Sequence, residues 1–133
     1  MELRPPYKEV TDHHDGSGAV NDDIRIFVRD EPGPGGAHHD YEISVPKLTA
    51  NVFTQAGYVR FIKGPRNEPG SVPGATQEAL LAIVIDRLRD FQAGPFACEE
   101  NQIALEATQL ALNTLKNRTR DRMARGVLGT TTK

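Results

Sequence analysis

The chain has 133 residues, of which 38% are hydrophobic, and a formal net charge of −2 at pH 7. This length predicts one domain, or a small sheet fused to a helical pair, with little apolar material to spare for a core. The near-neutral charge gives no reason to expect a nucleic-acid polymer or a membrane as partner. The single cysteine, Cys98, excludes an intramolecular disulfide and a metal site built from cysteines alone.

The charged residues are distributed unevenly along the chain. Residues 1–45 contain ten acidic and four basic residues, whereas residues 116–133 contain six basic residues and one acidic residue. This asymmetry indicates an anion site at the basic end or electrostatic pairing between subunits. No apolar run reaches the length of a transmembrane helix, and no signal-peptide pattern is found, so we expect an intracellular protein.

The first half of the chain, residues 1–65, is predicted to form a small antiparallel sheet of three or four strands. Residues 24–29, 41–45 and 58–62 are rich in β-branched and aromatic residues and partly alternate between apolar and polar. Glycines and prolines at 32–36 predict a turn that joins the first two strands into a hairpin. Residues 46–55 are ambiguous, and no periodic pattern precedes residue 24.

The second half, residues 66–133, is predicted to contain a linker and a C-terminal two-helix hairpin, which makes the fold class α+β. Thr76 is a suitable N-cap for the first helix, Gly94-Pro95 is a break, and a second helix is expected from Cys98 to Gly126. Apolar residues cover more than one face of that second helix: Ile103, Ala104, Leu105, Ala107, Leu110, Ala111, Leu112 and Leu115. Such a helix needs a second packing partner, either the sheet or another subunit, so we expect a homo-oligomer.

Three arginines near the end of the second helix are the first candidate for a binding site. Arg118, Arg122 and Arg125 follow an i, i+4, i+7 spacing and therefore share one face of the helix. Guanidinium groups can bind phosphate oxygens in a bidentate manner. Cations are also favoured at a helix C-terminus by the helix dipole, and spacing alone favours a solvated face.

Two phenylalanines, Phe91 and Phe96, flank the predicted turn. Either ring could stack on a nucleotide base, or both could hold the hairpin closed. For Phe96 we favour the closing role, whereas the sequence leaves both roles open for Phe91.

Two identical triplets, His13-His14-Asp15 and His38-His39-Asp40, could bind a divalent metal if they met in space. Adjacent histidines in a strand point to opposite faces, and both triplets lie beside glycine-rich segments, so we favour loops without a metal. No convincing catalytic constellation is found, and no cofactor is expected.

Several segments together resemble a known family, the phage Thoeris anti-defence sponges, whose helical hairpin is shared with phage anti-CBASS sponges. The segments are 79–88 (ALLAIVIDRL), Phe91-Gln92, 94–98 (GPFAC), Asn101, Ala104-Leu105, Arg118-Thr119 and 125–127 (RGV). The resemblance is specific over residues 66–130. Before residue 66 only the expected small sheet resembles the Thoeris-directed branch.

The resemblance implies a phage protein that binds and sequesters glycocyclic ADP-ribose, the signal of the Thoeris system, without cleaving it. It would act in the cytoplasm of the infected bacterium as a homodimer or hexamer, with a small molecule and itself as partners. Members of the family that form hexamers can also bind cyclic di- or trinucleotides in separate pockets. The alternative is a sponge mainly for the cyclic di- and trinucleotides of CBASS; a signal-cleaving enzyme and a virion protein are further alternatives.

The resemblance also implies roles for individual residues. Phe91 would stack on the adenine, Asn101 would hydrogen-bond the ligand, and Arg118 and Arg122 would hold the pyrophosphate. Arg66 would close the site from the linker.

A second nucleotide pocket would involve Arg125 and Thr130, in a C-terminal signature associated with subunit assembly. This chain departs from that signature at Leu128, where an acidic residue is usual, and at Thr131, where a histidine is common. The departures bear on the second pocket and leave the first unaffected.

Overall fold

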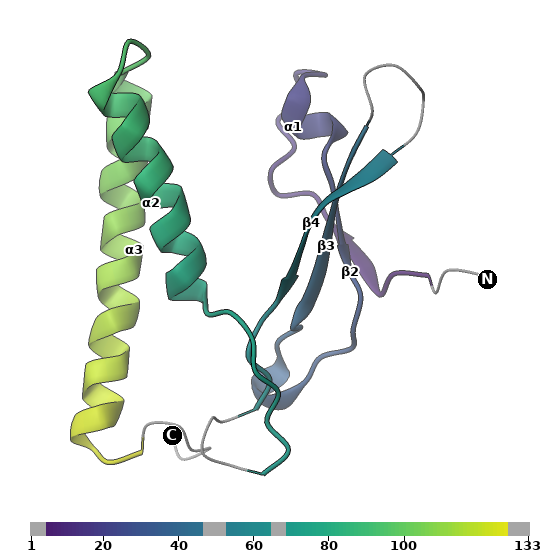
Figure 1. Ribbon diagram of the computed structural model, residues 1–133, viewed down its shortest axis with the longest axis vertical. Coiled ribbons are helices and arrows are strands. Elements are labelled where there is room, and N and C mark those ends of the chain that lie inside the picture. The colour runs from purple at the N-terminus through teal and green to yellow at the C-terminus, as the bar shows by residue number, and fades with distance from the viewer. Residues whose placement is uncertain (1–4, 47–52, 65–68, 128–133) are drawn as a thin grey trace. The chain divides into compact units, whose positions relative to one another are not determined.

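The computed structural model describes residues 5–46, 53–64 and 69–127. The chain divides into two compact units, Met1–Gly64 with Val72–Gly74, and Pro65–Ser71 with Ala75–Lys133. The first unit contains a β-sheet and the second a helical hairpin (Figure 1). The predicted α+β class is therefore confirmed.

Within the described residues, four strands form one antiparallel sheet in the order β1-β2-β3-β4. The strands are β1 (Lys8–Val10), β2 (Arg25–Val28), β3 (Asp40–Pro46) and β4 (Phe53–Arg60). The three predicted strands correspond to β2, β3 and β4, although β4 begins five residues before the predicted strand. The sequence pattern did not identify β1, because a strand of three residues is too short for its alternation to be recognised.

The long connection between β2 and β3 forms the predicted turn. A 3-10 turn at Pro34–Gly36 places Gly35 and Gly36 at φ +79° and +85°, a region that glycine adopts without steric strain. The side chain of Val28, the last residue of β2, is fully buried, and the rings of Tyr41 and Phe61 meet edge to face with their centroids 5.7 Å apart. The core of the first unit is therefore small.

The segment before β2 is more ordered than its lack of periodicity predicts. A short helix, α1 (Val20–Asp23), carries Asp22 at its centre. The Asp22 carboxylate accepts hydrogen bonds from the backbone N–H groups of Asp15, Gly16 and Gly18, at 2.8, 3.1 and 2.7 Å. These bonds lower the pKa of the Asp22 carboxyl group, since they stabilise its ionised form.

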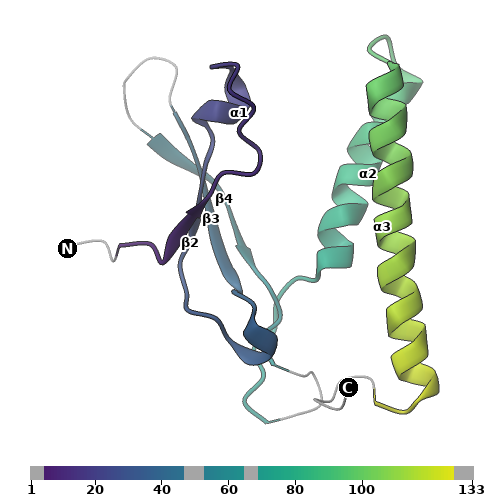
Figure 2. The same cartoon turned by 180° about the vertical axis from the view of Figure 1, so that it is seen from behind.

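The second unit consists of two antiparallel helices that lie side by side over the length of the shorter one, and the longer one continues beyond it (Figures 1 and 2). They are α2 (Gln77–Ala93) and α3 (Glu99–Ala124). The predicted N-cap of α2 is confirmed, because the Thr76 hydroxyl accepts a hydrogen bond from the backbone N–H of Ala79. At the C-terminal end of α3, Gly126 has φ +70°, the left-handed conformation typical of a helix C-terminus.

Only a narrow seam of the hairpin is buried. Ile85 of α2 is 3% exposed and Leu105 of α3 is 7% exposed. At 100° per residue, Ile103, Ala107 and Leu110 lie on the side of α3 opposite Leu105. Both Ile103 and Leu110 are more than half exposed. We name Ile103, Ala107 and Leu110 the outer stripe. Its exposure confirms the prediction that α3 has more apolar surface than α2 can cover.

The outer stripe does not indicate a membrane span. No helix in the described part of the chain is both long enough and apolar enough to cross a bilayer.

Candidate functional site

The turn of the hairpin forms a shallow hollow, which we name the tip hollow. It has a volume of about 310 Å³. Its lining residues come from the last turns of α2 and the following loop: Arg87, Asp90, Phe91, Gly94, Pro95 and Phe96. Phe91 is 42% exposed, and the Arg87 guanidinium lies 5.5 Å from the centre of its ring. The hollow therefore offers an aromatic surface and a cation, the two groups that stack well on a planar base.

Phe96 does not close the hairpin, contrary to our prediction. Its side chain is 74% exposed. Polar contacts of Gln92 hold the turn instead: its Oε1 accepts from the backbone N–H of Cys98 at 3.0 Å, and its Nε2 donates to Oε1 of Gln102 at 3.2 Å. Because the turn does not depend on aromatic packing, both rings are left available for a ligand or a partner.

Asn101 lies beside this turn, in the first turn of α3. Its backbone N–H donates to Sγ of Cys98 at 3.4 Å, so the predicted start of the second helix near Cys98 is confirmed. Asn101 itself is partly exposed. Its amide and the Phe91 ring are thus both at the tip end of the hairpin.

The three arginines lie at the opposite end of α3 and differ in their contacts. Arg118 is exposed. Arg122 is partly buried and donates from Nη2 to the carbonyl oxygen of Val127 at 3.1 Å. Arg125 follows the helix as its C-cap and lies 3.4 Å from a carboxylate oxygen of Asp121. Arg122 and Arg125 thus also support the end of the helix, whereas Arg118 projects into solvent.

One hairpin does not bring the predicted ligand-binding residues together. Arg118 follows Asn101 by 17 positions on the continuous helix α3, which corresponds to about 26 Å at 1.5 Å per residue. Figure 1 shows the turn and the end of α3 at opposite ends of the hairpin. A small cyclic nucleotide cannot reach both groups on the same chain. Arg66 and Thr130 lie outside the described residues.

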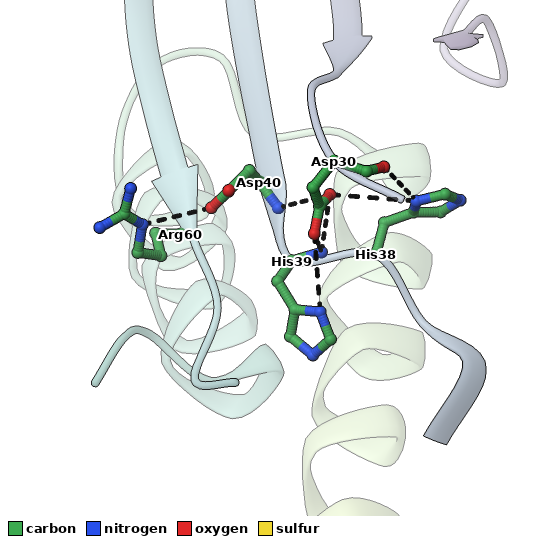
Figure 3. Close-up of polar contacts among 5 residues, drawn as sticks. All are labelled: Asp30, His38, His39, Asp40 and Arg60. Carbon is green, nitrogen blue, oxygen red and sulfur yellow. Dashed lines mark hydrogen bonds and ion pairs between the residues drawn. The ribbon is translucent and has the colours of Figure 1, made fainter. Parts of the chain in front are cut away.

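The second histidine triplet forms a polar network around Asp30 (Figure 3). The Asp30 carboxylate accepts hydrogen bonds from the backbone N–H groups of His39 and Asp40, with distances of 3.0–3.1 Å. Nδ1 of His38 lies 2.8 Å from the Asp30 backbone carbonyl, and Nδ1 of His39 lies 3.8 Å from the carboxylate. Burial raises the pKa of Asp30, but the backbone hydrogen bonds and the nearby histidines lower it by a larger amount. The net pKa shift is therefore downward.

The first triplet holds a different loop. Nε2 of His13 and Nε2 of His14 lie 2.6 and 3.2 Å from the backbone carbonyl of Ile24, and their rings are 4.4 Å apart. The first triplet lies in a loop, as expected, whereas the second ends at Asp40, the first residue of β3; both contact backbone groups. Across the described ranges, no group of three or more His, Cys, Asp or Glu side chains could hold a metal ion.

Two residues of the tip hollow, Arg87 and Asp90, were not predicted from the sequence as site residues. Arg87 precedes Phe91 by four positions, a spacing that places two side chains on the same helix face and could have revealed the contact. Asp90 carries no comparable signal, because a single acidic residue on an exposed helix face is common.

Comparison with known proteins relates the hairpin to a defined domain. The family model described as "Acb2/Tad1, hairpin domain" matches residues 56–120, which include α2, the turn and most of α3. A protein named Thoeris anti-defense 1, from Bacillus phage SBSphiJ7, is 44% identical over 85 residues, or 63% of this chain. The aligned part covers 59% of that relative, so this chain matches about three fifths of its length. The family match contains Phe91, Asn101 and Arg118.

Proposed function

Because this chain belongs to the phage anti-defence sponge family that carries the Acb2/Tad1 hairpin domain, we propose that it counters Thoeris defence by capturing glycocyclic ADP-ribose. It acts in the cytoplasm of the infected bacterium and withholds the signal from the defence effector. It binds the molecule stoichiometrically and does not cleave it. The observation that carries this proposal is the 44% identity to Thoeris anti-defense 1. It is supported by an exposed aromatic ring at the turn of the hairpin, which suits a base, and by arginines at the far end of α3, which suit phosphates.

The chemistry of the two ends suits the two parts of such a ligand. At the tip, the exposed face of Phe91 stacks on the adenine, and the Asn101 amide hydrogen-bonds the ligand beside it. At the far end of α3, Arg118 and Arg122 provide guanidinium groups for the pyrophosphate. Arg66, in the linker, completes the phosphate contacts.

The separation of the two ends requires a second copy of the chain. Two hairpins packed antiparallel would place the tip of each beside the arginine end of the other, because both groups lie on the same long helix. A twofold axis would then generate two identical sites. The outer stripe supports this assembly, since Ile103 and Leu110 expose apolar surface that a second hairpin could cover. The same symmetric dimer could be a building block of a hexamer.

Calorimetry with glycocyclic ADP-ribose tests the proposal directly. The parent protein should bind it, and Arg118→Glu should weaken binding about 100-fold or more, because a charge-assisted hydrogen bond is replaced by repulsion. Arg120→Glu is the matched control: it makes the same charge change on the same helix, at a residue that donates to Oδ1 of Asn117. If Arg118→Glu binds as tightly as the parent, the assigned phosphate site is wrong.

The fate of the ligand distinguishes a sponge from an enzyme. Heat denaturation of the complex should release intact glycocyclic ADP-ribose in the amount that was bound. Recovery of linear ADP-ribose or AMP would refute sequestration without turnover.

Cyclic oligonucleotides test the second pocket at Arg125 and Thr130. Cyclic tri-adenylate added to protein saturated with glycocyclic ADP-ribose should bind without displacing it if the two pockets are separate. If cyclic tri-adenylate binds and glycocyclic ADP-ribose does not, the protein is instead a sponge for CBASS signals.

A further inference from the structure

The tip hollow contains a carboxylate at a position where it does not stabilise the helix. Asp90 lies in the last turn of α2, a helix that ends at Ala93. This last turn contains no basic residue. The unsatisfied carbonyl groups of a helix C-terminus carry partial negative charge, so an acidic side chain there is electrostatically unfavourable. The helix would be more stable with a neutral residue at this position.

The neighbouring cation does not neutralise this carboxylate. Arg87 directs its guanidinium over the ring of Phe91, with the carbon at its centre 5.5 Å from the ring centroid. Among the ion pairs of the described residues, none involves Asp90. The hollow therefore presents a hydrogen-bond acceptor beside an aromatic surface.

We propose that Asp90 reads the base of the captured nucleotide, accepting a hydrogen bond from the exocyclic amino group of an adenine stacked on Phe91. A carboxylate accepts hydrogen bonds and cannot donate them, so on the N7 edge of a purine it favours the amino group of adenine and is repelled by the O6 and N7 acceptors of hypoxanthine. The ligand class is thus an aminopurine nucleotide, and its hypoxanthine counterpart should be rejected. This inference rests on the proposed function.

The same carboxylate orients the ligand. The negative charge of Asp90 offsets the positive charge of Arg87 in the tip hollow, so a pyrophosphate is attracted more strongly by the arginines at the end of α3 and points away from the hollow. The base then enters the hollow, and the phosphates face the arginine end of the second hairpin. Asp90 therefore gives both base specificity and orientation.

The test compares two ligands that differ only at the base. Calorimetry measures the dissociation constants of glycocyclic ADP-ribose and of its deaminated counterpart, in which a carbonyl replaces the amino group. The parent should prefer the amino ligand about tenfold, the effect of one hydrogen bond to a charged group. Asp90→Asn should reduce this preference to less than about twofold, because an amide can turn to donate or accept.

Asp86→Asn is the matched control, because Asp86 is exposed on the same helix, one turn away and outside the tip hollow. It should keep the parent's tenfold preference. Asp90→Asn should also unfold at an equal or higher temperature than the parent, as expected for removal of a charge that the helix dipole disfavours.

The outcomes separate this inference from the proposed function. If the parent binds neither ligand, glycocyclic ADP-ribose capture is wrong and the inference falls with it. If the parent binds both ligands equally, or Asp90→Asn keeps the preference, capture stands and the role of Asp90 is overturned.

Discussion

Leu110 offers a direct perturbation of the proposed assembly. It lies on the outer stripe of α3, and 68% of its surface is exposed in the single chain. Leu110→Gln removes apolar surface while preserving helix propensity, since leucine and glutamine are both good helix formers. Any effect on self-association can therefore be assigned to the interface and not to the helix.

The expected size follows from the exposed surface. Complete burial of a leucine side chain contributes about 1.5–3 kcal/mol, so covering the exposed two thirds contributes about 1–2 kcal/mol. A twofold interface contains the residue twice, which doubles the effect to about 2–4 kcal/mol. Since 1.4 kcal/mol is a tenfold change, Leu110→Gln should raise the dimer dissociation constant by about 30- to 1,000-fold.

Sedimentation equilibrium over a dilution series measures this constant, and circular dichroism checks that the helices are retained. Leu110→Met is the control at the same position, because methionine keeps most of the apolar surface, and it should assemble like the parent. If Leu110→Gln assembles as tightly as the parent, the outer stripe does not form the interface.

Three further predictions concern the sheet unit. Asp30→Asn should lower the free energy of unfolding by about 1–3 kcal/mol at neutral pH, because the carboxylate accepts two backbone N–H groups. Because the native pKa of Asp30 is lowered, the stability that its carboxylate contributes is present above about pH 4 and is lost as the pH falls through the native pKa. Urea unfolding at a series of pH values should therefore give free energies of unfolding for the parent and Asp30→Asn that become equal in acid. Asp22→Ala should speed amide hydrogen exchange at the three backbone N–H groups that donate to the Asp22 carboxylate. Unchanged exchange would show that Asp22 does not hold the loop. Gly74→Ala should destabilise by about 2 kcal/mol, because its Cβ would lie 2.4 Å from the backbone carbon of Phe61, whereas Gly57→Ala meets its nearest atom at 4.0 Å and should change the unfolding temperature little.

The sequence predicted those parts of the fold that local chemistry determines. Thr76 caps α2 and Gly126 ends α3, because a hydroxyl and a residue without Cβ meet the needs of helix ends. The sequence did not predict β1 or α1. β1 depends on its pairing with β2, a contact between residues distant in the sequence, and α1 has four residues, too few for a helical periodicity to be recognised.

The site illustrates the same limit. The sequence showed that Arg118 and Arg122 share one face of a helix. It also showed that Phe91 lies next to the predicted turn. The distance of about 26 Å between Asn101 and Arg118 follows from the single helix that the sequence already predicted, but the roles implied by the resemblance did not show that one chain cannot bring both groups to one ligand. The exposure of Phe96 was also not predictable, because the Gln92 side chain holds the turn through the backbone N–H of Cys98 and the side chain of Gln102 in α3.

A complementation experiment tests most directly the claim that two hairpins share one ligand. Phe91→Ala removes the tip surface and Arg118→Glu removes the phosphate contact, so neither variant alone should bind glycocyclic ADP-ribose. Equal amounts of the two variants, unfolded and refolded together, should recover about one quarter of the parent's binding sites at a ligand concentration that just saturates the parent, because half of the tips and half of the arginine ends are intact. A mixture that assembles but binds no ligand would contradict a site shared between subunits.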